Sequence, residues 1–239
     1  MERVLSFIAT CLIFATSFAQ TSFVRTHSGA YLIEKAAGSG FYLNSGNEIT
    51  RCNPEGNVVW TKKYTLTPSP VFQAFTVTPQ GNLVLYGKSV SFGWEKEVVL
   101  YCDSAGSVLW CWRDSIGFPT INVYTNAWIY SDSTHIISMQ SQEDTARILL
   151  LDHSGTLLRS ANFFTDSLHI WTNFATPYQR NLDDVVFTGC NRDRQGCYYF
   201  SYWIEHLMTP LPFFTSGLMK MDSLLNILWI RPLSVSASD

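Results

Sequence analysis

The feature that most constrains the fold of this chain is a short segment that recurs four times. The successive copies are spaced by 50, 49 and 70 positions, measured at their first polar residue. Repetition with a period near fifty residues is typical of repeat architectures, in which each period forms one supersecondary unit. The copies align without gaps and read CNPEGNVVW (52–60), CDSAGSVLW (102–110), LDHSGTLLR (151–159) and MDSLLNILW (221–229).

Each copy predicts a tight β-hairpin. In the second copy, the Asp103 carboxylate can accept hydrogen bonds from backbone amides further along the turn, and Gly106 tolerates a positive φ. Pro54 of the first copy stands where a type I turn prefers a fixed φ. The fourth copy has Leu225 in place of the glycine, so we expect its turn to differ or to be strained. The residues assigned to turns and packing are Asn53, Gly56, Trp60, Asp103, Gly106, Trp110, Asp152, Gly155, Asp222 and Trp229.

A second predicted hairpin precedes each copy, so each period holds four strands. In the second period, FQAFTVT (72–78) and NLVLYG (82–87) flank the turn residues PQG, and in the fourth, HIWTNFA (169–175) precedes DVVFTGC (184–190). Strands such as VVLYC (98–102) are continuously apolar, as strands buried on both faces are. The sequence therefore predicts an all-β chain with about four antiparallel, four-stranded blades. The predicted blades cover approximately residues 30–65, 71–115, 125–164 and 168–233.

Four-stranded units at this period are what a β-propeller requires. The chain resembles the blade repeats of secreted β-propeller proteins, especially surface-exported bacterial proteins whose repeats run strand, D-x-x-G-x-x-x-W, strand. Asp103, Gly106 and Trp110 fit this pattern fully, whereas the third copy has Arg159 in place of the tryptophan. The resemblance implies that the tryptophans pack between blades, and that the blades close a small ring or belong to a larger propeller. It does not specify a function, because propellers host binding, scaffolding and catalysis alike.

A more distant similarity is to quinoprotein-like propellers, whose tryptophan-docking motif also places Asp, Gly and Trp along one hairpin. That motif has one residue more between Asp and Gly, and its residues hold blades together rather than react. Such enzymes typically have about eight blades, against the four expected here. We therefore expect no cofactor.

The first nineteen residues, MERVLSFIATCLIFATSFA, have the pattern of a secretory signal peptide. Arg3 precedes an apolar run, and the small residues Ser17 and Ala19 predict cleavage before Gln20. The apolar run is shorter than the roughly 20 residues that a membrane-spanning helix needs. We expect residues 20–239 to form a secreted or cell-surface repeat domain without a transmembrane segment, with the periplasm as the alternative compartment.

The composition argues against nucleic acid as a partner and favours a neutral, aromatic surface. The formal net charge is -3, so no basic excess is present to neutralise phosphates. Charged residues make up 15% of the chain, against about 25% in a typical soluble domain. Aromatic residues also reach 15%.

Five of the six cysteines follow the signal peptide, and in an oxidising compartment an odd number leaves a thiol unpaired. Cys190 and Cys197 bracket the polar loop NRDRQG, and we predict a disulfide between them. Cys102 and Cys111 lie in two arms of one predicted hairpin but are not opposite each other, so a bond between them is not expected. Otherwise the pairing of Cys52, Cys102 and Cys111 stays open.

The spacing between the third and fourth copies is about twenty residues longer than the other two spacings. We assign this excess to an aromatic and proline-bearing insertion at residues 190–216, because long insertions are where rigid scaffolds tend to place function. The alternative is that the insertion covers exposed core. The candidate ligand-binding residues are Tyr198, Tyr199, Trp203, Phe213 and Phe214.

Catalytic residues are not identified by any motif in the sequence. Asp183 and Asp184 are adjacent, so on a strand they point to opposite faces and do not form a pair. The histidines do not show the short spacing typical of metal sites, so we expect no bound metal; they are His27, His135, His153, His169 and His206. The leading hypothesis is therefore a non-enzymatic binding or adhesion module for an extracellular glycan or protein. The alternative is a secreted hydrolase or lyase that acts on polysaccharide.

Overall fold

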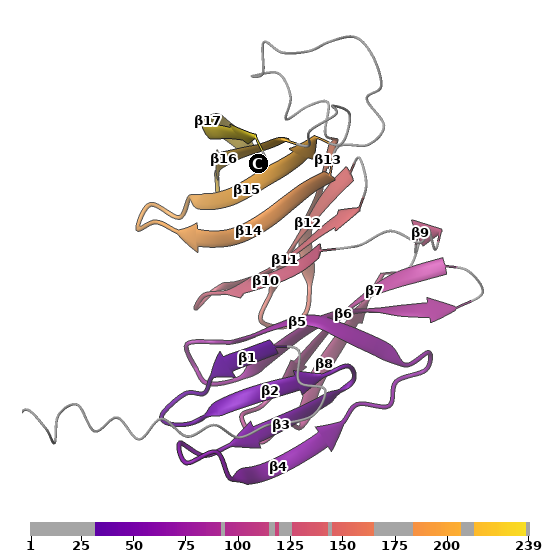
Figure 1. The fold of residues 1–239 in the computed structure, drawn as a ribbon. Coiled ribbons are helices and arrows are strands. Elements are labelled where there is room, and N and C mark those ends of the chain that lie inside the picture. Colours follow the sequence, from indigo (N-terminus) through magenta and orange to yellow (C-terminus); the bar gives the residue numbers. More distant parts are fainter. Residues whose placement is uncertain are drawn as a thin grey trace, which may run out of the picture.

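The computed structural model describes residues 32–91, 94–114, 118–119, 126–142, 145–164, 184–206 and 213–237. These residues form four antiparallel sheets, here named blades 1 to 4, in which the strands follow one another in chain order (Figure 1). Each blade has four consecutive strands, and the short β9 (Phe118–Pro119) pairs with β7 of blade 2. In this part of the chain, no helix is long and apolar enough to cross a membrane.

The strand bounds divide the chain into blades as follows. Blade 1 has β1 (Leu32–Lys35), β2 (Phe41–Ser45), β3 (Glu48–Cys52) and β4 (Val58–Lys63). Blade 2 has β5 (Pro70–Val77), β6 (Leu83–Ser91), β7 (Trp94–Cys102) and β8 (Val108–Arg113). Blade 3 has β10 (Asn126–Ser131), β11 (His135–Gln142), β12 (Thr145–Asp152) and β13 (Leu157–Phe164). Blade 4 has β14 (Asp184–Arg192), β15 (Tyr198–His206), β16 (Phe213–Met221) and β17 (Ile227–Ala237).

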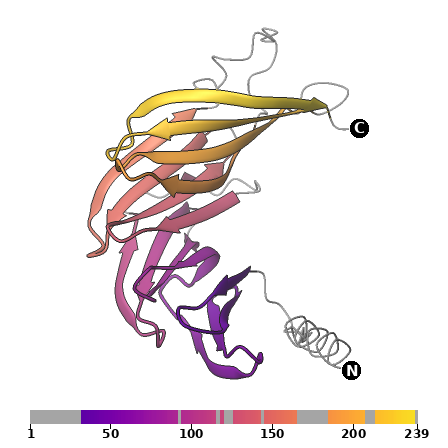
Figure 2. The same ribbon diagram turned by 90° about the vertical axis from the view of Figure 1, so that its left-hand side faces the viewer.

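The blades stack face to face in chain order and form an open arc. The first strands of successive blades contact one another, β1 with β5, β5 with β10 and β10 with β14. Blades 1 and 4 lie at opposite ends of the arc in both views (Figures 1 and 2). The described residues therefore do not form the small closed ring that was one of the two predicted arrangements.

The hydrophobic core lies between the blades rather than inside any one of them. On β7 the side chains alternate: Leu100 and Cys102 pack toward blade 1, and Val99 and Tyr101 pack toward blade 3. All four side chains are buried. This two-sided burial explains why the strand reads as a continuous apolar run, since both faces of a middle blade are removed from water.

The four recurring turns share one geometry. In each, the Oδ1 atom of the first polar residue accepts a hydrogen bond from the backbone N–H four positions later. The glycines of the first three turns have φ between 76° and 86°, a region that only glycine adopts without strain. The N···O distances are 2.8 Å for Asn53 and Asn57, 2.7 Å for Asp103 and Ser107, 2.9 Å for Asp152 and Thr156, and 2.8 Å for Asp222 and Asn226.

Leu225 adopts the same turn conformation as the glycines that it replaces. Its φ is 61°, and its N–H donates to the Asp222 carbonyl at 3.1 Å, so the turn is strained rather than different in shape. A left-handed conformation costs a non-glycine residue about 1–2 kcal/mol. Leu225 is only 2% exposed and packs in the core between blades 3 and 4. Burial of a leucine side chain contributes about 1.5–3 kcal/mol, which offsets the strain.

The tryptophans of the first two copies pack onto the turn of the following blade. A Cβ atom built on Gly106 would lie 2.8 Å from the Trp60 ring, and one built on Gly155 would lie 2.8 Å from the Trp110 ring. The Trp110 indole N–H also donates to the His153 carbonyl at 2.9 Å. Glycine is therefore required at these turns for two reasons: the positive φ, and the indole ring that occupies the space of a side chain.

The segment 190–216, predicted to be an insertion, contributes strands to blade 4 instead. Its described residues complete β14, form all of β15 and begin β16, and β15 lies between those two strands in the sheet. Each of these three strands is nine residues long. The predicted first strand of this blade, residues 169–175, lies outside the described residues, and the sheet begins with β14. Much of the additional spacing therefore falls at residues 165–183, which precede β14 and are also outside the described part.

The predicted disulfide between Cys190 and Cys197 is wrong, because both thiols are free. The β14–β15 hairpin closes with the Asp193 N–H donating to the Cys197 carbonyl at 2.9 Å. This register places Cys190 opposite Phe200, three positions from Cys197 along the second strand. Cys190 packs against the core between blades 3 and 4, and burial raises the pKa of its thiol well above the ordinary value. Cys52, Cys102 and Cys111 are likewise thiols rather than halves of a disulfide.

Candidate functional site

The candidate ligand-binding residues on β15 separate onto two faces of blade 4. Tyr198 is fully buried and packs toward blade 3. Tyr199 and Trp203 alternate with it along a regular strand, so they lie on the opposite face, and both are partly exposed. Phe213 and Phe214 belong to β16, but their side chains lie outside the described part of the structure.

The face of blade 4 that points away from blade 3 is here named the outward face, and it lies at one end of the arc (Figure 1). Cross-strand pairing places Lys220 opposite both Tyr199 and Trp229, and Arg231 follows Trp229 by two positions on β17. Period-two alternation therefore puts aromatic and cationic side chains on one surface. The described residues of this face include Tyr199, Ser201, Trp203, Leu218, Lys220, Trp229 and Arg231.

Aromatic rings and cations alternate on the outward face at contact distance. The rings of Tyr199 and Trp229 meet edge to face, with centroids 5.9 Å apart. Lys220 Nζ lies 4.8 Å from the Tyr199 centroid, and the Arg231 guanidinium carbon lies 4.9 Å from the Trp229 centroid. Such cation–π contacts hold the rings in fixed orientations and keep their faces near positive charge.

Asp193 links this face to the β14–β15 turn. Its Oδ2 atom accepts a hydrogen bond from the Tyr199 hydroxyl at 3.2 Å and lies 3.5 Å from Lys220 Nζ. Desolvation raises the pKa of Asp193, but backbone and hydroxyl donors together with Lys220 lower it more, so the net pKa lies below its ordinary value. The contact with Tyr199 raises the pKa of Lys220. Both groups are therefore charged near neutral pH.

Asp193, Lys220 and Arg231 are not among the residues predicted from the sequence. The segment DRQG (193–196) fits the same D-x-x-G pattern as the recurring turns, and its Gly196 has a φ of 87°. That pattern was the signal for the turn. Lys220 and Arg231 carry no motif, and their position beside the rings follows only from the cross-strand register.

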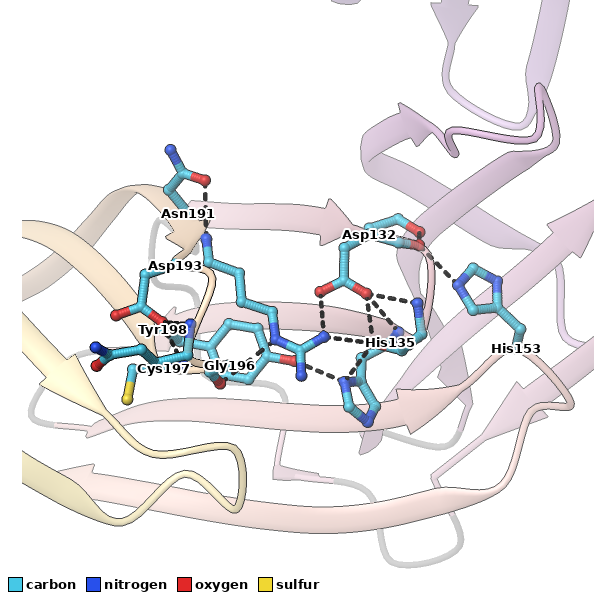
Figure 3. A network of polar contacts seen from close by, with 12 residues as sticks. Asp132, His135, His153, Asn191, Asp193, Gly196, Cys197 and Tyr198 are labelled. Carbon is cyan, nitrogen blue, oxygen red and sulfur yellow. Dashed lines mark hydrogen bonds and ion pairs between the residues drawn. The ribbon is translucent and has the colours of Figure 1, made fainter.

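A separate polar network joins blades 3 and 4 at their turns (Figure 3). Asp132 Oδ1 accepts hydrogen bonds from the Thr134 and His135 backbone N–H groups at 2.6 and 2.8 Å. Asp132 Oδ2 lies 3.2 Å from Arg192 Nη1, which forms an ion pair between the blades. His153 Nε2 lies 2.8 Å from the Asp132 carbonyl oxygen, which is an acceptor, so this nitrogen carries the proton. The polar groups of this network pair with one another and link blades 3 and 4. The network is here named the clasp.

His135 is a titratable group of this clasp. Its Nδ1 atom lies 2.7 Å from the Tyr198 hydroxyl and 3.0 Å from Thr134 Oγ1, and the neutral ring can accept a hydrogen bond there. Desolvation by burial and the Arg192 charge lower the pKa of His135, and Asp132 opposes them, with a net lowering. The groups that act on this pKa are Asp132, Arg192, His153 and Asp152.

We expect the stability of the protein to fall as the pH drops below about 6.5, the ordinary pKa of histidine. The unfolded chain binds the proton at a higher pH than folded His135 does, so the contribution is present above that pH and is lost as the pH falls through the folded pKa. Melting temperatures measured between about pH 8 and pH 5 test this. The variant His135→Asn keeps an acceptor for Tyr198 without titrating, and it should show a shallower pH dependence. An unchanged slope in this variant would assign the effect to another group.

In the described part of the chain, no group of three or more His, Cys, Asp or Glu side chains is placed to hold a metal ion. Two of the predicted histidines, His135 and His153, take part in the clasp, whereas the other three lie outside the described residues or have undescribed side chains. Of the adjacent aspartates, Asp183 is also outside, and Asp184 begins β14.

Comparison with known proteins supports the fold and leaves the function open. No protein-family model matches the chain, and no curated protein has a significantly similar sequence. The extracellular region of plexin A4 matches with a TM-score of 0.52 and 12% identity, over 82% of this chain and 26% of that one. Lignostilbene dioxygenase from Pseudomonas brassicacearum matches with a TM-score of 0.50 and 10% identity, over 89% of this chain and 48% of that one. A Bacteroides vulgatus protein of the DUF4221 family gives a TM-score of 0.49 at 8% identity, over 89% and 69%.

The chain thus has a β-propeller type of fold, with four antiparallel blades that match part of larger propeller-containing chains. It spans about half the length of the dioxygenase and about a quarter of the plexin chain. At these identities the similarity shows the fold alone.

Proposed function

We propose that this protein is a secreted or cell-surface binding module without enzymatic activity, built on β-propeller blades of the kind found in exported bacterial proteins. Its ligand is an extracellular carbohydrate or a protein, and it binds the outward face of blade 4. The observation that carries the proposal is the set of aromatic rings and cations on that face. The signal-peptide pattern of residues 1–19 supports export.

The chemistry of the outward face suits a ligand that combines flat apolar surface with acceptors. Tyr199, Trp203 and Trp229 offer amphipathic rings, on which the C–H faces of sugar rings or the side chains of a protein can pack. Arg231 is exposed beside them and presents hydrogen-bond donors for hydroxyl, carbonyl or carboxylate oxygens. Rigid strands hold these groups, so little side-chain ordering is needed when a ligand binds.

The alternative function is cleavage of polysaccharide by a hydrolase or lyase. The carboxylates that the described structure brings together do not support it. Glu97 and Asp114 both approach Arg147, at 3.2 and 2.5 Å. Their side chains are only 2% and 5% exposed, between blades 2 and 3. A substrate does not reach carboxylates that are buried and already bound to an internal guanidinium.

Replacing both Tyr199 and Trp203 with alanine is expected to weaken binding to polysaccharide by about tenfold or more, because aromatic anchors dominate such surfaces. The measurement is biolayer interferometry against immobilised neutral and acidic polysaccharides, with folding checked by circular dichroism. The matched control is Leu158→Ser, which changes an exposed aliphatic side chain on blade 3. A double variant that binds as tightly as the unchanged protein would rule out this face as the polysaccharide site.

A further inference from the structure

Blades 1 and 4 carry the same arrangement of four side chains on equivalent strands. The four side chains of blade 1 are here named the blade-1 tetrad, and they are Tyr42, Arg51, Trp60 and Lys62. The rings of Tyr42 and Trp60 have centroids 5.9 Å apart. Arg51 lies over the Tyr42 ring at 5.0 Å, and Lys62 lies over the Trp60 ring at 5.8 Å. Arg51 lies on β3, directly opposite Tyr42 of β2. Lys62 lies on β4, two residues after Trp60.

The blade-4 tetrad, which is Tyr199, Lys220, Trp229 and Arg231, repeats this arrangement position by position. Tyr199 pairs with Lys220 across β15 and β16, and Lys220 pairs with Trp229 across β16 and β17, as the blade-1 residues do across β2, β3 and β4. The ring centroids are again 5.9 Å apart. Arg231 follows Trp229 by two residues, as Lys62 follows Trp60. The two tetrads therefore present one kind of surface.

The blade-1 tetrad is occupied by the recurring turn of blade 2. The Tyr42 hydroxyl donates to the Ser104 carbonyl at 3.3 Å, and Lys62 Nζ donates to Ser107 Oγ at 3.4 Å. The Trp60 ring lies against Gly106 of the same turn. The tetrad thus binds a hairpin turn through its backbone, its glycine and the residue after the glycine.

The other joints between blades follow the same rule. The Trp110 ring lies against Gly155 of the blade 3 turn. Arg159, at the tryptophan position of blade 3, donates through Nη2 to Asn226 Oδ1 at 2.7 Å, and Asn226 again directly follows the turn position of the glycine. At each of the three joints, one blade contacts the turn of the next.

Apart from Asp193 of its own β14–β15 turn, the described residues place no turn of another blade on the blade-4 tetrad, and the geometry points to a hairpin turn of a second copy of this chain as its ligand. We propose that the turn at residues 53–57 of blade 1 in one molecule docks on the blade-4 tetrad of another. This inference rests on the proposed function, because it names a protein ligand for the same outward face. Two such joints close two arcs into a ring, and propellers of eight blades lie within the usual range.

The turn at residues 53–57 has the features that the occupied joints use. Gly56 has a φ of 79° and is already buried, so the joint forms through the exposed neighbours Pro54, Glu55 and Asn57. Asn57 occupies the position of Ser107 and Asn226, which accept hydrogen bonds from the preceding blade. Arg231, at the position of Lys62, is therefore the donor to Asn57 of the second copy. Glu55 is the acidic side chain of this turn and complements the two cations of the tetrad.

The test is the molar mass of the secreted chain by light scattering after size exclusion, over a series of protein concentrations. We expect concentration-dependent dimers. Arg231→Glu should raise the dissociation constant about tenfold or more, because it replaces a donor with a charge that repels Glu55. Asn57→Arg should weaken association as well, since it faces the cations. Combining both substitutions in one chain restores opposite charges across the joint, and dimers should return.

The variant Leu158→Ser is the matched control, because it removes an exposed aliphatic side chain from blade 3 without touching either partner surface. Protein that stays monomeric at every soluble concentration would overturn the inference, and so would dimers that are insensitive to Arg231→Glu. If the protein is monomeric but the Tyr199 and Trp203 double variant loses polysaccharide binding, the proposed function stands and this inference fails.

Discussion

Replacing Trp110 with alanine is expected to destabilise the protein by roughly 3–5 kcal/mol, the range for removal of a large aromatic side chain from a packed site. The indole ring stacks on Tyr101 with centroids 5.1 Å apart and an interplanar angle of 7°. It also lies against Gly155, and its N–H donates to the His153 carbonyl. The variant leaves a cavity at the joint between blades 2 and 3 and an acceptor without its donor. Urea unfolding followed by fluorescence or circular dichroism measures the loss.

Two further variants separate the contributions of the ring and of the joint. Trp110→Phe keeps an aromatic ring but removes the N–H donor, so we expect a loss of about 1–2 kcal/mol. Trp229→Ala alters the same repeat position on the outward face of blade 4, where the described residues supply no following turn, and should cost less in the monomer. A Trp110→Ala variant that stays fully stable but no longer binds a ligand would contradict the packing role.

The turns were predictable because their signals are local. The Asp103 side chain reaches an amide only four positions away, and Gly106 must adopt a positive φ within the same turn. Such requirements are visible in a single short segment, and their repetition gave the number of blades. Leu225 shows the limit of this reasoning, because burial between blades stabilises a conformation that its own backbone disfavours.

The candidate site was predictable only in part, because it depends on which face of a strand each side chain occupies. Tyr198 and Tyr199 are neighbours of the same kind, yet one is buried against blade 3 and the other lies on the outward face. The irregularity in pairing between Phe187 and Gly189 shifts the register of β14 against β15. A shift of one residue exchanges the two faces of a strand, and nothing local in the sequence fixes it.

The aromatic content of residues 190–216 was misleading for a related reason. A long strand in the middle of a blade packs against neighbouring sheets on one or both sides, so it needs rings such as Phe200 and Tyr202 for the core. In sequence, that need resembles an exposed aromatic platform. The same register sets Cys190 opposite Phe200 and thereby removes the predicted disulfide.

Replacing Arg147 with methionine is expected to destabilise the protein by about 3–5 kcal/mol at neutral pH, because it removes the guanidinium that pairs with two buried carboxylates. Arg147 Nη1 lies 3.2 Å from Glu97 Oε2 and 2.5 Å from Asp114 Oδ2, and it joins β12 of blade 3 to β7 and to the residue that follows β8 in blade 2. Glu97 also accepts a hydrogen bond from the buried Tyr86 hydroxyl at 2.9 Å. Methionine preserves most of the side-chain volume, so the loss reports the charge rather than a cavity.

The pH dependence of this variant identifies the charge responsible. Desolvation raises the pKa of Glu97, and the attraction of Arg147 lowers it less than burial raises it. Without Arg147 the pKa of Glu97 rises further, so Glu97 takes up a proton on folding and the penalty shrinks as the pH falls. The deficit of Arg147→Met relative to the unchanged protein should therefore be smaller near pH 5 than near pH 7. The double variant Glu97→Gln, Arg147→Met should recover part of the loss at neutral pH, whereas an equal deficit at both pH values and no recovery would show that the arginine acts through packing alone.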